Sequence, residues 1–245
     1  MHLRSIMYHD VVENGDFAAS GFPGEGANVY KLRREDFERH LDALGETRVH
    51  LTFDDGGASF LDPIAGMLEE RGRRGWFFIT TGRIGTPGFL SADQVRELHR
   101  RGHTVGSHSD THPTRMAALT RAEMDREWRV SLDRLSGVVG AHVTTASVPG
   151  GYYSREVGRA AAAQGIAQLF TSEPTARVAN VDGCMVYGRY VVMRGMPAAW
   201  SAGFAAGSPA YCWRQTALWK AKRVAKALGG EAYLKVRRSI LERKS

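Results

Sequence analysis

Two adjacent carboxylates end a short, mainly apolar run near the start of the chain. Asp54 and Asp55 follow residues 49–53 directly, and Gly56 and Gly57 come next. Neighbouring side chains on a strand point to opposite faces, so one carboxylate can hold a metal ion while the other handles protons. The glycines let the backbone turn at once and approach a ligand closely. Asp and Gly are also common in plain solvent-exposed turns, so other residues must decide between the two interpretations.

A pair of histidines supplies the second chemical group. His108 and His112 lie four residues apart, and the Ser, Asp and Thr residues around them, with Pro113, favour an irregular loop over a helix. On a tight turn this spacing can bring both imidazoles to one cation. Two neutral imidazoles and one carboxylate form a three-ligand set for catalytic zinc, with a position left for water. Asp110 is a further candidate ligand, and a surface or capping role is the alternative for each histidine.

Alternating strands and helices must position these groups. Two capping boxes, at residues 91–94 and 120–123, mark helix starts. The pattern predicts a long loop over residues 11–29. It predicts strands at 5–8, 49–53, 76–81, 103–108, 143–148, 167–171 and 187–193, and helices at 32–44, 60–70, 92–101, 121–135 and 155–164. This alternation indicates an α/β fold with a parallel sheet, either a closed barrel or an open doubly wound sheet.

The ends of the predicted strands favour the barrel. Polar residues follow several of them: His9 and Asp10, the Asp54–Asp55 pair, His108, and the turn at Pro149. In a (β/α) barrel the carboxyl ends of the strands converge on one mouth, where active sites lie.

Composition limits the class of protein. The 245 residues are 43% hydrophobic and 24% charged, as expected for a soluble globular chain. Two cysteines exclude a disulfide scaffold and a Cys-rich zinc site. No run reaches membrane-spanning length, and the first ten residues lack a signal-peptide core, so a cytoplasmic location is expected.

The net charge of +7 comes from the end of the chain. Residues 211–245 carry ten Lys or Arg and two Glu, whereas residues 1–210 carry 23 basic and 24 acidic side chains. We therefore expect a barrel domain at 1–210 and a basic, amphipathic helical extension at 211–245. The extension either contacts the inner membrane face peripherally or packs its apolar side on the barrel. Nucleic-acid binding is not predicted, because the basic charge is confined to this extension.

The two motifs together resemble a known family. Thr52-Phe53-Asp54-Asp55-Gly56 and the later His108-Ser109-Asp110-Thr111-His112 are similar to the first two motifs of the polysaccharide deacetylase (NodB-homology) family. The resemblance covers roughly residues 5–195. It implies a distorted (β/α) barrel of seven or eight units that removes acetyl groups from amino sugars with a divalent metal, usually zinc. It also implies Asp54 as catalytic base and Asp55, His108 and His112 as metal ligands.

The third family motif is only partly present. The family usually has Arg, any residue, Pro, an aromatic residue and Gly; this chain has Ser147, Val148, Pro149, Gly150 and Gly151. The resemblance implies that the backbone N–H of Gly150 stabilises the oxyanion, while Ser147 replaces the arginine that orients the base. Pro149, Gly151 and the following Tyr152 are weaker candidates for substrate binding.

The late histidine of the family is missing, because no histidine follows His142. Met7-Tyr8-His9-Asp10 resembles the start of a branch that acts on poly-N-acetylglucosamine, in which the motif order is permuted. This resemblance implies His9 as general acid; a structural role at the strand end is the alternative. Asp10 is expected either to orient His9 or to contact substrate.

The predicted function is hydrolysis of the N-acetyl group of an amino sugar in a polysaccharide or its lipid-linked precursor. The partner is therefore an N-acetylated glycan. Two other functions remain open: a glycan-binding module that has lost turnover, favoured by the altered third motif, and a deacylase of a small non-sugar amide.

Overall fold

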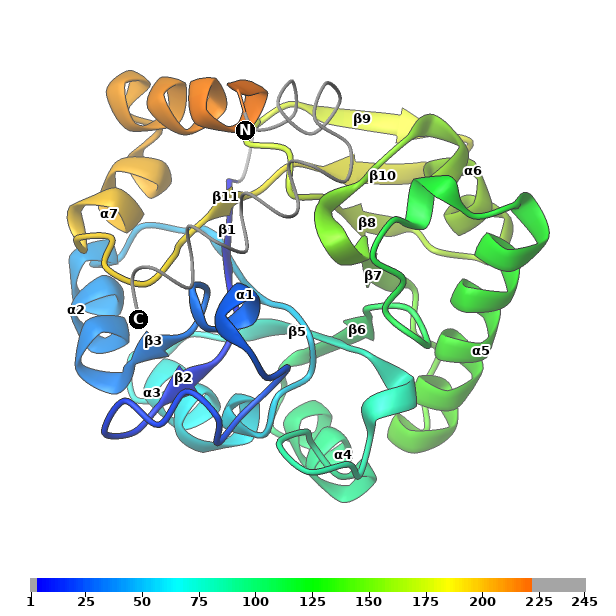
Figure 1. The fold of residues 1–245 in the computed structure, drawn as a ribbon, viewed down its shortest axis with the longest axis horizontal. Helices are drawn as coiled ribbons and strands as arrows, with labels where there is room; N and C mark the ends of the chain where they lie inside the picture. The colour runs from blue at the N-terminus through cyan, green and yellow to red at the C-terminus, as the bar shows by residue number, and fades with distance from the viewer. Residues whose placement is uncertain (1–3, 222–245) are drawn as a thin grey trace.

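The computed structural model describes residues 4–221 as a curved β-sheet wrapped by helices (Figure 1). The order of the strands in the sheet is β11-β1-β4-β5-β6-β7-β8-β10-β9. Their bounds are β1 (Ser5–Tyr8), β4 (His50–Phe53), β5 (Gly75–Ile79), β6 (Thr104–Ser107), β7 (Thr145–Ser147), β8 (Gln168–Phe170), β9 (Val178–Val181), β10 (Cys184–Tyr187) and β11 (Tyr190–Val191).

The order of the strands identifies the architecture. The strands β1, β4, β5, β6, β7 and β8 are added one after another to the same side, each in parallel with the one before it in this series. In this sheet only β9 is antiparallel, against β10. A doubly wound sheet instead reverses its order at a switch point. The last strand, β11, returns to the free side of β1. The sheet curls into a half-barrel, which confirms the predicted distorted (β/α) barrel.

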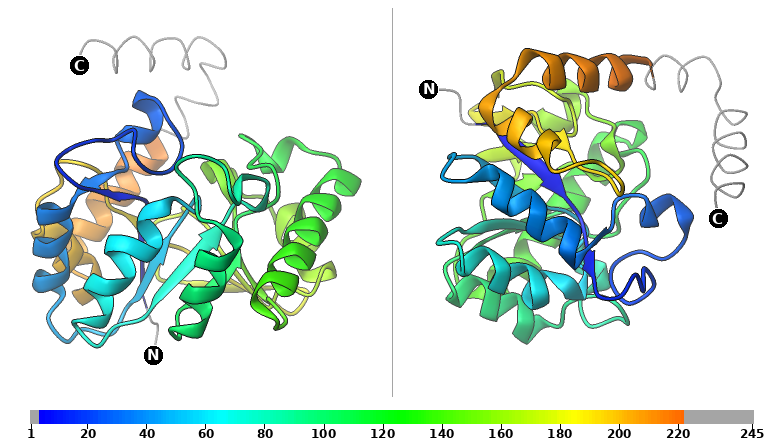
Figure 2. Two further views of the ribbon diagram at one scale, coloured as in Figure 1. Left: turned by 90° about the horizontal axis from the view of Figure 1, so that it is seen from below. Right: turned by 90° about the vertical axis from the view of Figure 1, so that its left-hand side faces the viewer.

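Helices cover the outer face of the sheet (Figures 1 and 2). They are α2 (Arg34–Leu44), α3 (Gly66–Glu69), α4 (Ala92–Arg100), α5 (Arg121–Val139), α6 (Arg155–Ala163) and α7 (Ala199–Ala206). Both predicted capping boxes are present, at the starts of α4 and α5. The helix predicted at 121–135 is four residues longer and ends where Gly140 adopts a left-handed conformation.

The loops after the carboxyl ends of the strands face the viewer in Figure 1 and lie at the top of the left view in Figure 2. The segment predicted as a plain loop at 11–29 contains the short elements β2 (Val11–Val12) and α1 (Glu25–Asn28), and β2 pairs with β3 (Leu32–Arg33). Five short helical turns complete the description: η1 (Ala58–Phe60), η2 (Leu61–Ala65), η3 (Thr81–Arg83), η4 (Met116–Ala118) and η5 (Pro149–Gly151).

The predicted helix at 60–70 is wrong in its first half. Asp62 has extended backbone angles, φ −141° and ψ 118°, so the chain winds irregularly through η1 and η2 before α3 begins. Pro63 explains the break, because proline lacks an N–H donor and disfavours a helical conformation in the residue before it. Ile64 and Met67, in η2 and α3, are both buried.

The predicted strand at 187–193 is confirmed only in part, by β11. β10 ends at Tyr187, β11 begins at Tyr190, and the two residues between them leave the sheet. β9 and β10 form a hairpin that we did not predict. Its turn is Asp182-Gly183, and both residues have positive φ (52° and 91°). This dipeptide is a strong hairpin signal and was present in the sequence.

The end of the described chain packs on the barrel. A helix over residues 209–221 begins just before the predicted boundary at 210. Gln215 donates to the carbonyl of Val191 at 2.6 Å, and the Thr216 hydroxyl donates to the carbonyl of Pro174 at 3.1 Å. Most of the predicted basic extension, residues 222–245, lies outside the described residues. Within residues 4–221, no helix is both long and apolar enough to cross a membrane.

Candidate active site

Asp55, His108 and His112 form a compact cluster at the mouth of the half-barrel. One potential ligand atom of each lies within 4.8 Å of the others. Oδ1 of Asp55 is 3.4 Å from Nε2 of His108 and 3.4 Å from Nε2 of His112. Two ligands about 2.1 Å from a tetrahedral zinc ion lie about 3.4 Å apart, so the cluster fits a divalent cation. The predicted ligand set is therefore brought together.

A backbone carbonyl sets the orientation of His108. Its Nδ1 lies 3.0 Å from the carbonyl oxygen of Ser147 at the end of β7. An imidazole nitrogen facing a carbonyl must carry the proton, so Nε2 keeps its lone pair for a cation. His108 is 2% exposed, which shields this arrangement from water.

The loop that carries His112 is anchored by α5. The carboxylate of Glu127 accepts hydrogen bonds from the backbone N–H groups of Asp110 and Thr111, at 3.0 and 2.9 Å, and from the Thr111 hydroxyl at 2.7 Å. The backbone N–H of His112 donates to the Ser109 hydroxyl at 3.1 Å. Asp110, our further candidate ligand, instead accepts hydrogen bonds from Thr81 and Arg134 and is not part of the cluster.

Backbone strain also concentrates here. Asp55, Ser109 and His112 have φ values of 89°, 64° and 58°, a left-handed region that side chains usually avoid. Each such residue costs about 1–3 kcal/mol and persists only where its surroundings enforce it. The fold therefore holds two of the three candidate ligands in conformations that the isolated chain disfavours.

The structure reveals a site residue that we did not predict. Arg189, fully buried between β10 and β11, binds both carboxylate oxygens of Asp54 at 2.7 Å. It also donates to the Thr171 carbonyl and to the hydroxyls of Thr52 and Ser147. All five N–H donors of this guanidinium are thus used, which fixes the plane of the Asp54 carboxylate.

Asp54 therefore has an arginine partner, although Ser147 replaces the motif arginine. Ser147 stands at the motif position of the usual arginine, and its hydroxyl joins Arg189 to Asp54, donating to the carboxylate at 3.1 Å. Arg189 lies in the connection between β10 and β11, which comes later in the chain than the third motif. The only sequence signal for it was an arginine inside a segment predicted as an apolar strand, so its contact with Asp54 was not foreseeable from local pattern.

Electrostatics keep the site ionised. Burial alone would raise the pKa of Asp54, but the Arg189 and His108 charges outweigh it and lower that pKa. For Asp55, burial is likewise outweighed by the hydrogen bonds with His108 and His112, which hold its pKa well below the usual range. Burial opposes protonation of His108, yet Asp54 and Asp55 raise its pKa. At neutral pH both aspartates are carboxylates.

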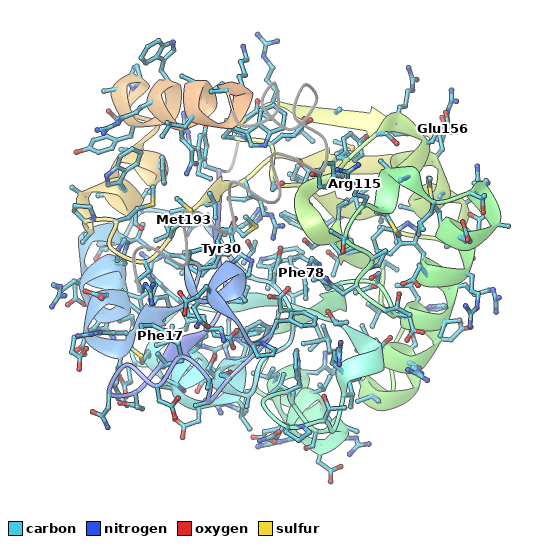
Figure 3. The ribbon with its side chains drawn as sticks, in the orientation of Figure 1. Phe17, Tyr30, Phe78, Arg115, Glu156 and Met193 are labelled. Carbon is cyan, nitrogen blue, oxygen red and sulfur yellow. The ribbon has the colours of Figure 1, made fainter. Side chains whose placement is uncertain are left out.

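His9 lies at the same mouth. Its ring packs on Tyr30 with 4.8 Å between centroids, and its buried Nδ1 has no hydrogen-bond partner among the described residues. Burial lowers the pKa of His9, while Asp55 and Asp54 act in the opposite direction. Tyr30, labelled in Figure 3, carries this packing contact on the loop that follows α1.

The side chain of Asp10 is enclosed by other protein residues. It is 1% exposed, and its carboxylate accepts hydrogen bonds from the hydroxyls of Ser20 at 2.6 Å and Ser59 at 2.8 Å. A side chain at Gly21 or Gly57 would collide with it. Asp10 thus joins the end of β1 to two loops, and this arrangement offers no support for a contact with substrate.

The third-motif residues form the tight turn η5. Pro149 is buried, and Gly150 and Gly151 have positive φ values of 67° and 73°. A side chain at Gly150 would collide with the carbonyl of Thr114, so this close approach requires glycine. Tyr152 follows, half-buried, with the Arg115 guanidinium 5.2 Å from its ring centre.

Comparisons with known proteins agree on one family. Residues 42–169, 128 of the 245, match the sequence model of the family described as polysaccharide deacetylase. YxkH of Bacillus subtilis (strain 168), named as a polysaccharide deacetylase, is 28% identical over 197 residues, covering 71% of this chain. The aligned part is 66% of YxkH, slightly under two thirds of its length.

Two solved structures share the fold. The Streptococcus pyogenes deacetylase PplD, in complex with acetate, superposes with a TM-score of 0.65 at 18% identity, over 80% of this chain and 95% of its own. IcaB from Ammonifex degensii superposes with a TM-score of 0.61 at 20% identity, over 84% and 99% of the two chains.

Proposed function

Because the chain belongs to the polysaccharide deacetylase family, we propose that it hydrolyses the N-acetyl group of an amino sugar in a polysaccharide or its lipid-linked precursor, releasing acetate. The observation that carries this proposal is that a candidate metal-ligand cluster and an ionised carboxylate lie side by side at the mouth of the half-barrel. A ligand cluster of Asp55, His108 and His112 lies beside an ionised carboxylate, Asp54, whose nearer oxygen is 3.9 Å from Nε2 of His108.

The proposed mechanism assigns separate tasks to the adjacent aspartates. Asp54 accepts the proton of the attacking water, since it is ionised and held in one plane by Arg189. Asp55, His108 and His112 would hold a divalent cation, in the first place zinc. When bound, such a cation polarises the acetamide carbonyl and lowers the pKa of its water to about 7.

The backbone N–H of Gly150 is proposed to stabilise the oxyanion of the tetrahedral intermediate. Its place in a turn that admits only glycine fixes the direction of this donor. The neighbouring Pro149, Gly151 and Tyr152 would then border the substrate. Each positioned donor of this kind typically contributes about 10²- to 10³-fold in rate.

His9 is proposed to protonate the leaving amine, as in the branch with permuted motifs. Two observations support it: the chain has no histidine after His142, and the His9 Nδ1 lacks a partner among residues 4–221. The role requires the imidazolium form, which burial opposes and the Asp54 and Asp55 carboxylates favour.

Turnover is favoured over the idea of an inactive glycan-binding module. That idea rested on the altered third motif and on the missing late histidine. Arg189 supplies Asp54 with the arginine that Ser147 replaces, and His9 is the proposed substitute for the histidine. No contact of the described residues specifically favours a small non-sugar amide.

Metal content and acetate release test the proposed activity. The chain should bind about one zinc per molecule and release acetate from N-acetylglucosamine oligomers, and chelation should abolish the release. His108→Ala should lose zinc and activity together, whereas His99→Ala, which alters an exposed histidine on α4, should keep both. Acetate release that persists in chelator, or in His108→Ala at the native rate, would disprove the mechanism.

The C-terminal extension is proposed to contact an anionic membrane surface peripherally. Trp213 and Leu218 are 74% and 51% exposed on the helix at 209–221, although the opposite side of this helix packs on the barrel. Exposed apolar side chains beside basic ones are the composition of an interfacial helix.

A further inference from the structure

Three arginines at the mouth lie over aromatic rings. In each pair the centre of the guanidinium is 4.5 to 5.3 Å from the centre of the ring. The pairs are Arg83 with Phe22, Arg115 with Tyr152, and Arg194 with Phe17. Stacking occupies the flat face of a guanidinium and leaves its N–H edge available for a ligand.

All three arginines follow the carboxyl ends of parallel strands. Arg83 lies in η3 after β5, Arg115 comes after β6, and Arg194 comes after β11. Figure 3 labels Phe17, Tyr30 and Arg115 on the loops around this opening. The three pairs therefore surround the mouth that holds the candidate reaction centre.

These guanidiniums lack carboxylate partners, although their neighbours have them. No ion pair within residues 4–221 includes Arg83, Arg115 or Arg194, and all three side chains are exposed. Nearby, Arg34 pairs with Glu13 at 2.7 Å, and Arg134 pairs with Asp110 at 3.0 Å. The positive charge at the mouth is thus left uncompensated at three points.

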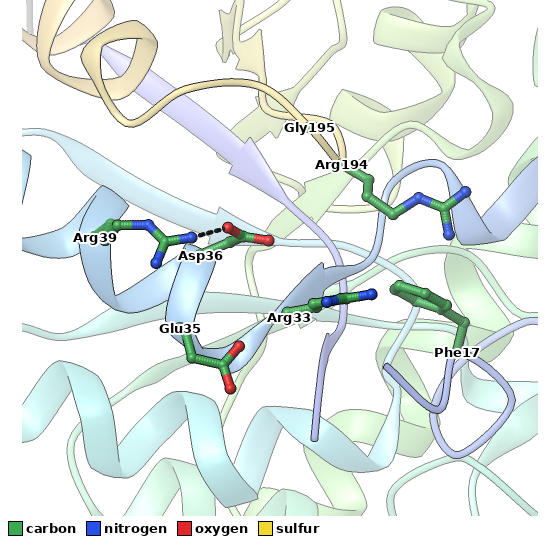
Figure 4. Close-up of a pocket in the computed structure, with 7 residues that line it drawn as sticks. All are labelled: Phe17, Arg33, Glu35, Asp36, Arg39, Arg194 and Gly195. Atoms are coloured by element: carbon green, nitrogen blue, oxygen red, sulfur yellow. Dashed lines mark hydrogen bonds and ion pairs between the residues drawn. The ribbon is translucent and has the colours of Figure 1, made fainter. Parts of the chain in front are cut away.

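One pair opens into a pocket of about 450 Å³ (Figure 4). Arg33 and Arg194 both extend toward the ring of Phe17, and neither has an ion-pair partner in the described part of the chain. Of the two acidic side chains in the pocket, Asp36 is paired with Arg39, and in Figure 4 Glu35 lies on the opposite side of Arg33 from Phe17. The part of the pocket around Phe17 is therefore cationic.

One of these arginine–aromatic pairs contacts the candidate reaction centre directly, and a second is linked to it through Lys31. Phe22, under Arg83, packs on the metal-ligand candidate His112 with 4.8 Å between ring centres. On the other side, the carbonyl of Phe17 accepts a hydrogen bond from Lys31 at 2.6 Å, and Lys31 directly follows the Tyr30 that packs on His9. A glycan bound at the candidate metal site would therefore have the Arg83–Phe22 pair on one side and the Arg194–Phe17 pair on the other.

We propose that the substrate is an anionic glycan, whose carboxylate or phosphate groups are bound by Arg83, Arg115 and Arg194. Arg33 adds a second guanidinium for the group that enters the Phe17 pocket. The fork of a guanidinium matches carboxylate and phosphate oxygens, and the aromatic rings offer flat faces to neighbouring sugars. A neutral homopolymer would leave every one of these charges without a partner. The inference rests on the proposed deacetylase function and names the chemical class of its substrate.

Binding measured without turnover separates this inference from the proposed activity. Calorimetric titration of the full chain in chelator should give an affinity about 10-fold higher for a hyaluronan tetrasaccharide than for chitotetraose, about 1.4 kcal/mol. UDP-N-acetylglucosamine, compared with N-acetylglucosamine, distinguishes phosphate from carboxylate recognition. The preference should disappear as salt rises from about 50 mM to about 500 mM. Equal affinities for the acidic and neutral ligands in both comparisons would overturn the inference, whatever the result for acetate release.

Two substitutions locate the charge that is responsible. Arg194→Gln and Arg83→Gln should each lower the ratio of acidic to neutral affinity several-fold. Arg214→Gln is the matched control, because Arg214 also lies over an aromatic ring, Trp200 of α7, at 5.2 Å but is not on a strand-end loop. An unchanged ratio in Arg194→Gln and Arg83→Gln, or an equal loss in Arg214→Gln, would contradict the assignment.

Discussion

At the scale of single residues, the strongest feature is the buried pair of Asp54 and Arg189. Two charges that are 3% and 0% exposed are stable together because each satisfies the other and all five donors of the guanidinium are used. Removing one partner of such a buried pair costs about 3–5 kcal/mol, because the remaining charge is left uncompensated. Asp54→Asn is consequently expected to be destabilised as well as inactive.

Arg189→Met tests the pair through the pH dependence of catalysis. Without the arginine, burial raises the pKa of Asp54, and the carboxylate is the form that accepts a proton. Activity should therefore be lost at a higher pH during acidification than in the unsubstituted chain. Arg189→Lys keeps the charge and should shift the acidic limb of kcat/KM less.

Arg96→Met is the control for this series, because Arg96 forms an exposed ion pair with Asp93 on α4. The kcat/KM profile of this variant should match that of the unsubstituted chain. If Arg189→Met keeps the same acidic limb, Asp54 is not the proton acceptor.

The sequence predicted part of this site and missed part of it, for a physical reason. Asp54 and Asp55 directly follow a predicted strand, His108 ends another, and His112 lies four residues further on. Parallel strands place such residues at one end of the sheet. The cluster of Asp55 with the two histidines confirms that these three meet, while their roles stay predictions. Arg189 follows no periodic pattern, and its contact with Asp54 exists only after two strand connections are folded against each other.

At the scale of elements, most of the barrel could be predicted because its strands and helices carry strong local signals. The errors lie where a short-range feature overrides periodicity: Pro63 interrupts a helical pattern, and the Asp182-Gly183 turn creates a hairpin. The pairing of β11 with β1 has no local signal, since it joins the last strand of the chain to the first.

Asp10 links three elements and makes a pH-dependent contribution to their stability. Burial raises its pKa to about 6 from an ordinary 3.8, so the folded chain favours the protonated form. This contribution is present below about pH 4 and is lost as pH rises through about 6. A shift of about two units corresponds to about 3 kcal/mol, which is an upper bound for this single group.

Denaturant unfolding of the metal-free chain at several pH values checks this expectation. The stability of Asp10→Asn, relative to the unsubstituted chain, should improve as pH rises from about 4 to about 7, because the variant has no carboxyl group to ionise. Asp16→Asn, an exposed change in the same loop, should show no such trend. A constant difference for Asp10→Asn across this range would show that Asp10 does not carry the contribution.

At the scale of the whole molecule, the half-barrel is covered on its outer side by helices that are pinned to it. Tyr8 in β1 bonds to the Ser201 hydroxyl of α7 at 2.8 Å, and the same hydroxyl lies 2.6 Å from Nδ1 of His40 in α2. This buried contact fixes α7 against α2, shortly before the helix over residues 209–221. Trp213 and Leu218 are exposed on that helix.

Vesicle sedimentation tests the proposed membrane contact of this helix. The chain should sediment with anionic vesicles and not with neutral ones, because basic residues near a surface contribute about 1 kcal/mol each. Deleting residues 222–245, or changing Trp213→Ser together with Leu218→Ser, should weaken sedimentation. Equal sedimentation of the unsubstituted chain and both variants would exclude the extension as the contact.

The long reach of Arg189 to Asp54 has a consequence for the order of events during synthesis. The candidate ligands Asp55, His108 and His112 and the proposed base Asp54 have all been synthesised once the chain reaches residue 112. Arg189, which binds Asp54, is separated from it by 135 positions in the chain. The Asp54 carboxylate therefore gains its arginine partner only after the connection between β10 and β11 has been made, and the proposed activity depends on that late segment.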